Sequence, residues 1–186
     1  MEMRKEENKK HVGILSMQRI KNYGSFLQAY GLKKMIESLG HTVEFVDYHI
    51  EDSIVKDTVE ESGLKRKLNK GLYVLKDDAK LSHKVQYIVH KKNFDKKFFN
   101  VLGMTEEPNY TPKLDTLVIG SDEVFNCIQK NANVGYSLEL FGKDNNAERL
   151  ISYAASFGNT TIEKLENYNK KDEIGGLLNK FDAISV

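Results

Sequence analysis

Short apolar runs and helical repeats alternate along the first part of this chain. The run at residues 11–16 ends in a polar loop, after which apolar residues recur at the i, i+3, i+4 and i+7 spacing of one helix face, up to Gly40. This pattern predicts a strand followed by a helix over residues 23–39. The β-branched and aromatic residues of 42–47 predict a second strand, which completes a β-α-β unit with parallel strands.

The second half of the chain continues this alternation. Residues 115–119 and 149–155 predict a third and a fourth strand. Thr160 and Glu163 have the spacing of a capping box, and the apolar repeat that follows them predicts one last helix. Residues 182–186 predict the start of another strand. We therefore expect an α/β fold, with a Rossmann-like open parallel sheet of at least four strands and flanking helices.

Residues 51–110 interrupt the alternation. Two or three helices are predicted there, and the two prolines of the chain, Pro108 and Pro112, bracket the loop that returns to the sheet. We interpret 51–110 as a helical insertion in one Rossmann-like domain over 11–186, preceded by a charged tail at 1–10. Because the last predicted strand has neither a polar tail nor a capping turn after it, we expect the chain to be truncated before a second domain.

The composition is that of an ordinary globular protein. Of 186 residues, 40% are hydrophobic and 30% are charged, which excludes the disordered, collagen-like and coiled-coil classes. The single cysteine excludes a disulfide framework and a cysteine-based zinc cluster, and the five histidines lack ligand spacing, so we expect no metal. No stretch approaches the roughly 18 apolar residues of a spanning helix, so we expect no transmembrane segment and a cytoplasmic location.

The net charge of +1 hides a basic segment at residues 64–100. It holds eleven basic side chains and three acidic ones, a net charge of +8. Lysine dominates arginine there, and the apolar residues have helical spacing, which favours the solvated faces of surface helices over nucleic-acid binding. We therefore expect no nucleic-acid partner, although such a face could attract anionic substrates or make a peripheral membrane contact.

In an open parallel sheet, ligands bind beyond the carboxyl ends of the strands. This rule selects three loops, at residues 17–25, 120–126 and 156–158. The first loop lacks the G-x-G-x-x-G pattern, so a classical dinucleotide site is not expected. Within it, Asn22 and Ser25 either cap the following helix or share its free N–H groups with an anion, and their spacing favours neither reading.

Two acidic side chains and one hydroxyl lie at the predicted strand ends. Asp47, at the end of the second strand, is interpreted as a turn residue. Ser156 resembles a nucleophile elbow, but such hydrolases place a histidine after the serine, and no histidine follows His90. Asp122 is a candidate general base toward a sugar hydroxyl, because it directly follows a strand beside a glycine and a hydroxyl. Residue chemistry alone favours the alternative, an Asp that caps a short helix.

Four segments that contain these loops carry a resemblance to a known family. They are Asn22-Tyr-Gly-Ser-Phe-Leu-Gln-Ala-Tyr30, Gly120-Ser-Asp-Glu-Val-Phe-Asn126, Ile151-Ser-Tyr-Ala-Ala-Ser-Phe-Gly158 and Phe181-Asp-Ala-Ile-Ser-Val186. In this order they resemble the polysaccharide pyruvyl transferase family, and the resemblance spans nearly the whole chain. Phe125 stands where the family usually has tryptophan, which is a conservative aromatic change.

The resemblance implies an architecture and an activity. The architecture is of the GT-B type, in which two Rossmann-like halves face each other across a cleft, and this chain covers the first half. Family members of known activity transfer pyruvate from phosphoenolpyruvate onto two hydroxyls of a sugar, making a cyclic ketal and releasing phosphate. The resemblance thus implies a role in bacterial exopolysaccharide biosynthesis, with phosphoenolpyruvate as donor, no further cofactor, and a sugar or lipid-linked saccharide as acceptor.

The resemblance also implies which residues form the site. Asp122 is expected as the catalytic residue. The residues expected to bind substrate are Asn22, Tyr23, Gly24, Ser121 and Asn126. Arg19 is the one arginine in a predicted cleft loop, so the cations that hold phosphoenolpyruvate are expected in the missing second domain. The isolated chain is therefore expected to be inactive.

Two function classes besides pyruvyl transfer stay open at this point. One is a GT-B glycosyltransferase that uses a nucleotide sugar, which tighter binding of nucleotide sugars than of phosphoenolpyruvate would favour. The other is a non-catalytic module that binds an anionic polymer or membrane through the lysine-rich segment, which salt-sensitive binding to polyanions would favour.

Overall fold

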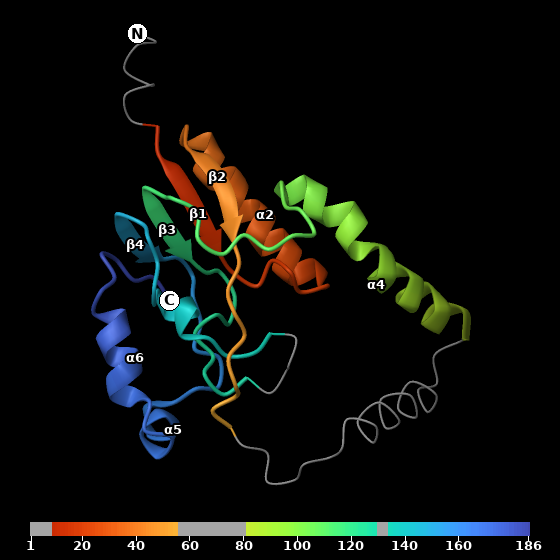
Figure 1. Ribbon diagram of the computed structural model, residues 1–186. Coiled ribbons are helices and arrows are strands. Elements are labelled where there is room, and N and C mark those ends of the chain that lie inside the picture. Colours follow the sequence, from red (N-terminus) through yellow and green to blue (C-terminus); the bar gives the residue numbers. More distant parts are fainter. Residues whose placement is uncertain (1–8, 56–80, 130–133) are drawn as a thin grey trace.

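A four-stranded, all-parallel sheet in the order β2-β1-β3-β4 forms the centre of the molecule (Figure 1). The computed structural model describes residues 9–55, 81–129 and 134–186. The strands are β1 His11–Leu15, β2 Thr42–Val46, β3 Thr116–Ile119 and β4 Arg149–Ser152. The α/β class and the first four strands predicted from the sequence are confirmed, and their bounds lie within three residues of the prediction.

The strand order creates a topological switch between β1 and β3. From β1 the chain crosses to β2 at the edge of the sheet, and it later returns to β3 on the other side of β1. The pairing aligns Leu15 with Val46 on one side and with Ile119 on the other, so the carboxyl ends of these three strands lie level with one another. In doubly wound sheets the crevice beyond such a switch point is where ligands bind.

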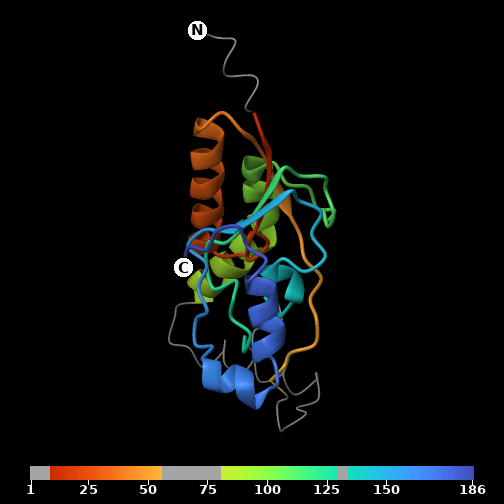
Figure 2. The ribbon, with the colours of Figure 1, turned by 90° about the vertical axis from the view of Figure 1, so that its left-hand side faces the viewer.

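Helices cover both faces of the sheet. They are α2 Tyr23–Ser38, α4 Leu81–Leu102, the 3-10 helix η1 Leu138–Phe141, α5 Ile162–Asn167 and α6 Lys171–Leu178. Neighbouring strand residues point to opposite faces. Val118 accordingly belongs to an apolar cluster with α2 and α4, whereas Ile119 belongs to a second cluster with η1, α5 and α6. In both views α5 lies beyond the carboxyl ends of the strands (Figures 1 and 2).

The helix predicted over residues 23–39 is confirmed as α2, but the prediction of a single last helix is wrong. Two helices, α5 and α6, stand in its place, and the capping residue is Thr161, whose side chain accepts a hydrogen bond from the backbone N–H of Lys164. Asn169 lies between the two helices with φ of 54°, in the left-handed region that ends helices. The spacing of apolar residues in the sequence does not indicate this break, because the repeat continues across Asn169, the one residue between the two helices with a left-handed backbone conformation.

The strand predicted at residues 182–186 forms only in part. Asp182 donates its backbone N–H to the carbonyl of Leu150 at 2.8 Å, and Ser152 donates to Ala183 at 3.0 Å. One isolated parallel bridge joins Ile151 and Ala183. The segment therefore lies along the outer edge of β4 and begins a fifth position in the sheet.

The insertion predicted over residues 51–110 contains α4, of 22 residues. The other helices predicted there fall largely on residues 56–80, outside the described residues, as does much of the lysine-rich segment. No helix in the described part of the chain combines the length and apolar character needed to cross a membrane.

Candidate functional site

The loops after β1 and β3 are joined by side-chain hydrogen bonds at the switch point. The Ser16 hydroxyl, buried at the end of β1, donates to the carbonyl of Ser121 at 2.8 Å. The Ser25 hydroxyl, in the first turn of α2, donates to Asp122 Oδ2 at 2.8 Å. Two of the loops selected from the sequence thus converge, and they place Asp122 beside the start of α2.

Asp122 has an uncommon backbone conformation. Its φ is 94°, a region that L side chains rarely adopt and that costs on the order of 1–3 kcal/mol. The surrounding hydrogen bonds hold it there: Oδ1 accepts from the Glu123 backbone N–H at 2.9 Å, and the Asp122 carbonyl accepts from Val124 and Ser156. The bond to Ser156 ties the loop after β3 to the loop after β4. Strain retained in this way is typical of functional sites.

The residues predicted around the start of α2 act in its capping and packing. The Asn22 side chain accepts a hydrogen bond from the Gly24 N–H at 2.8 Å, so of the two readings left open for Asn22 the cap is the one observed. The Tyr23 ring meets the rings of Phe94 and Phe98 on α4 edge-on, and about half of the residue stays exposed. Contact of these residues with a substrate stays a prediction.

Asn126, predicted to bind substrate, ties two loops together. It is buried, and its Oδ1 accepts hydrogen bonds from the Ile128 N–H at 3.2 Å and from the Thr160 hydroxyl at 3.1 Å. Thr160 in turn accepts from the Cys127 N–H at 2.9 Å, which explains why it does not cap α5. The Asn126 Nδ2 donates to Glu123 Oε2 at 2.9 Å.

An open groove of about 960 Å³ lies beside this network. Its walls come from the loops after β3 and β4 and from α5. They include Glu123, Asn126, Ser156, Gly158, Lys164 and Tyr168. Asp122 is not among the lining residues, whereas the exposed Glu123 is. Sequence reasoning missed Glu123, although its place in the segment Gly120-Ser-Asp-Glu was a signal that could have singled it out.

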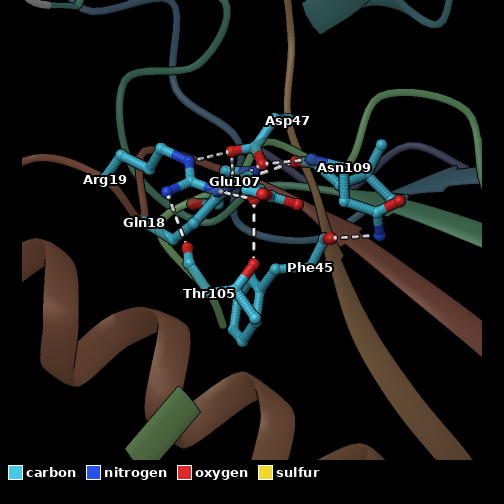
Figure 3. Close-up of polar contacts among 9 residues, drawn as sticks. Gln18, Arg19, Phe45, Asp47, Thr105, Glu107 and Asn109 are labelled. Atoms are coloured by element: carbon cyan, nitrogen blue, oxygen red, sulfur yellow. Dashed lines mark hydrogen bonds and ion pairs between the residues drawn. The ribbon is translucent and has the colours of Figure 1, made fainter. Parts of the chain in front are cut away.

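Arg19, the one arginine in a predicted cleft loop, is held in an ion pair (Figure 3). Its Nε donates to Asp47 Oδ1 at 2.5 Å and its Nη2 to Asp47 Oδ2 at 2.7 Å. The same guanidinium donates to the carbonyls of Thr105 and Glu107, both at 3.1 Å. These hydrogen bonds to Asp47 raise the pKa of Arg19 above its ordinary value.

The carboxylate of Asp47 also accepts hydrogen bonds from residues other than Arg19. It is buried, and it accepts from Gln18 Nε2 at 3.2 Å and from the Asn109 backbone N–H at 2.8 Å (Figure 3). The interpretation of Asp47 as a turn residue is therefore wrong, because its carboxylate joins the loops after β1 and α4. A hollow of about 430 Å³ adjoins the pair, but the hydrogen bonds of Arg19, Asp47 and Gln18 are directed to one another and to the backbone.

The described residues offer neither a thiol nucleophile nor a metal centre. Cys127 is fully buried, and burial raises the pKa of its thiol to about 12, which keeps the unreactive neutral form at physiological pH. Within residues 9–55, 81–129 and 134–186, no group of three or more His, Cys, Asp or Glu side chains could hold a metal ion.

Comparison with known proteins agrees with the four segments quoted from the sequence. The model of the family described as polysaccharide pyruvyl transferase matches residues 22–186. Searches of curated proteins and of solved structures gave no match to the chain. The matched region covers the loop after β3, the loop after β1 from Asn22 onward, the groove and every predicted site residue. The chain therefore belongs to the polysaccharide pyruvyl transferase family.

Proposed function

We propose that this protein transfers the pyruvyl group of phosphoenolpyruvate onto two hydroxyls of a saccharide during bacterial exopolysaccharide biosynthesis in the cytoplasm. In this proposal the chain is the first half of a GT-B enzyme. The observation that carries it is that the family match, over residues 22–186, includes Ser25 and Asp122, whose side chains join the start of α2 to the loop after β3 at the topological switch of a parallel sheet. A sugar or lipid-linked saccharide would be the acceptor.

The reaction defines what the site has to supply. One sugar hydroxyl adds to C2 of phosphoenolpyruvate while C3 gains a proton and becomes a methyl group. A second hydroxyl of the same sugar then bonds to C2 as the C2–O bond to phosphate breaks, and its proton leaves with the released phosphate. The chemistry therefore needs a proton donor for C3, an acceptor for hydroxyl protons, and cations for the carboxylate and phosphate.

Asp122 is the carboxylate that we propose as the proton acceptor. It lies at the switch point, and Ser25 and the Glu123 N–H fix the direction of its side chain. Each carboxylate oxygen accepts two hydrogen bonds, so Asp122 keeps capacity for a substrate hydroxyl. Ser121 and the start of α2, with Asn22, Tyr23 and Gly24, would form the wall around it.

The cations for phosphoenolpyruvate are proposed to come from the second domain. Arginine suits a carboxylate or phosphate through paired hydrogen bonds, but Arg19 already makes such a pair with Asp47. Arg149 begins β4 and so lies at the opposite, amino-terminal edge of the sheet. We accordingly propose that the isolated chain is inactive and that its essential partner is the second half of the enzyme.

The test is phosphate release from phosphoenolpyruvate by the protein together with any sequence that follows Val186, assayed over a panel of saccharides. Release that depends on the saccharide supports the proposal, and we expect Asp122→Asn to lower kcat by about 10²–10⁴-fold, the usual contribution of a positioned base. Asp144→Asn, which removes a carboxylate from another residue with positive φ, is the control and should retain activity. Tighter binding of nucleotide sugars than of phosphoenolpyruvate would instead point to a glycosyltransferase.

A further inference from the structure

We propose that the groove between the loops after β3 and β4 and helix α5 binds the acceptor saccharide, with Glu123 accepting hydrogen bonds from two of its hydroxyls. The assignment of the saccharide as a substrate rests on the proposed function, whereas the binding itself rests on the groove. Glu123, Ser156, Lys164 and Tyr168 supply the polar and aromatic groups of its walls.

Glu123 presents a carboxylate with free capacity to this groove. Its Oε2 accepts one hydrogen bond, from Asn126 Nδ2 at 2.9 Å. Its Oε1 has no hydrogen-bond partner within the described part of the chain, and the residue is exposed. A carboxylate has about four lone-pair sites, so Glu123 can accept from two neighbouring hydroxyls of a bound sugar at once.

The direction of this carboxylate is fixed before any ligand arrives. Asn126 holds Glu123 and is itself held by the Ile128 N–H and the Thr160 hydroxyl. Gly158, with φ of 54°, approaches the pair so closely that a Cβ there would lie 2.6 Å from Glu123 Oε2 and 2.8 Å from Asn126 Nδ2. The glycine thus leaves room for an oriented Glu123–Asn126 pair, and such preorganisation lowers the entropic cost of binding.

The part of the groove formed by α5 suits the ring of a sugar. Tyr168, at the end of α5, is 39% exposed, so its ring offers an apolar surface to the C–H face of a pyranose. Lys164 donates from Nζ to the carbonyl of Asn159 at 2.6 Å, and an ammonium group has three donors, which leaves donors for sugar oxygens.

The charge of the groove favours the acceptor over the donor. Among the described residues that line it, the charged groups are the carboxylate of Glu123 and the ammonium of Lys164, which balance each other. Phosphoenolpyruvate carries a carboxylate and a phosphate, and a site for it needs an excess of cations. A neutral, hydroxyl-rich ligand fits better. The Ser156 N–H donates to the carbonyl of Asp122 at 2.9 Å, which joins this wall of the groove to the backbone of the proposed base.

The test is calorimetric titration of a panel of pyranosides into the wild-type protein and three variants. Glu123→Gln changes the loop after β3, and Tyr168→Ala changes the residue at the end of α5. Glu163→Gln makes the same chemical change on an exposed residue of α5 outside the groove and is the matched control. Thermal unfolding of each variant, compared with the wild type, shows that the fold is retained.

We expect Glu123→Gln and Tyr168→Ala each to weaken pyranoside binding about tenfold, while Glu163→Gln binds as the wild type does. We also expect monodeoxy analogues of the bound sugar to lose more affinity for the wild type than for Glu123→Gln. Equal affinity of the wild type and Glu123→Gln, or no binding of any pyranoside to the wild type, would overturn the proposal.

The two proposals fail separately. Groove-dependent saccharide binding without any turnover of phosphoenolpyruvate would leave the saccharide site standing and overturn pyruvyl transfer. Saccharide-dependent phosphate release whose KM for the saccharide is the same in Glu123→Gln would support pyruvyl transfer and overturn the assignment of Glu123.

Discussion

At the scale of single residues, backbone conformation decides which of two adjacent carboxylates faces the groove. Asp122 and Glu123 follow each other in the same segment, and the sequence singles out Asp122 because it lies next to Gly120 and Ser121. The positive φ of Asp122 and its bond to Ser25 turn that side chain toward α2 and leave Glu123 in the groove. Sequence pattern does not report such a φ for a non-glycine residue, so this division could not be predicted.

The ion pair between Arg19 and Asp47 leads to a prediction about stability. We expect Asp47→Asn to lower the free energy of unfolding by about 2 kcal/mol, because it leaves a half-buried guanidinium without its charged partner. Urea denaturation measures the change. Glu166→Gln removes the exposed ion pair with Lys171 and should leave the free energy of unfolding nearly unchanged. Equal effects of the two substitutions would contradict the structural role given to Asp47.

A thiol and two phenol groups that are buried or partly buried predict a loss of stability in alkaline solution. Burial raises the pKa of Cys127 and of Tyr48 to about 12, and it also raises the pKa of Tyr136. Above the ordinary values of 9.0 for the thiol and 10.0 for the phenols, the unfolded chain therefore binds fewer protons than the folded one. Stability is full below about pH 9 and should fall as the pH rises toward 12.

Denaturation at about pH 8 and about pH 10.5 checks this prediction. The free energy of unfolding should be lower at the higher pH, and the difference should shrink in Tyr48→Phe, which removes one of the titrating groups. A free energy of unfolding that stays constant or increases over this range would contradict the burial of these side chains.

At the scale of elements, local signals predicted the strands and α2 but not the break between α5 and α6. A strand is recognisable when a run of β-branched and aromatic residues ends in polar turn residues, as 42–47 does. The break depends on Asn169, whose left-handed conformation is common for asparagine but not required by it. Thr160 does not cap α5 as predicted, because its hydroxyl donates to Asn126. The two residues are 34 positions apart, and the periodicity of the sequence does not show that they are in contact.

Asn22 has two predicted roles, capping of α2 and contact with a substrate, and substitutions of Asn22 can separate them. We expect Asn22→Ala to lower the free energy of unfolding by about 1 kcal/mol, because the Gly24 N–H loses its side-chain acceptor. Asn22→Ser keeps an acceptor and should restore most of that stability. Urea denaturation of both variants decides the matter: if the alanine variant is as stable as the wild type, Asn22 is free for another role.

At the scale of the whole molecule, the sequence predicted the parallel sheet and the family, whereas the arrangement of the site required the structure. Parallel strands followed from the β-α-β pattern, and four short segments carried the family. The strand order and the ion pair between residues 19 and 47 arise from contacts between distant parts of the chain. Such contacts bring the loops after β1, β3 and β4 together at the switch point, beside the groove.

The most direct test of the central claim is transfer of a labelled pyruvyl carbon. The protein, with any sequence that follows Val186, is incubated with phosphoenolpyruvate labelled with ¹³C at C2 and with a pyranoside that binds to it. Pyruvyl transfer predicts that the enol carbon signal is replaced by that of a ketal carbon attached to the sugar, with one phosphate released for each ketal formed. Phosphate release that yields free pyruvate and an unmodified sugar would contradict the account.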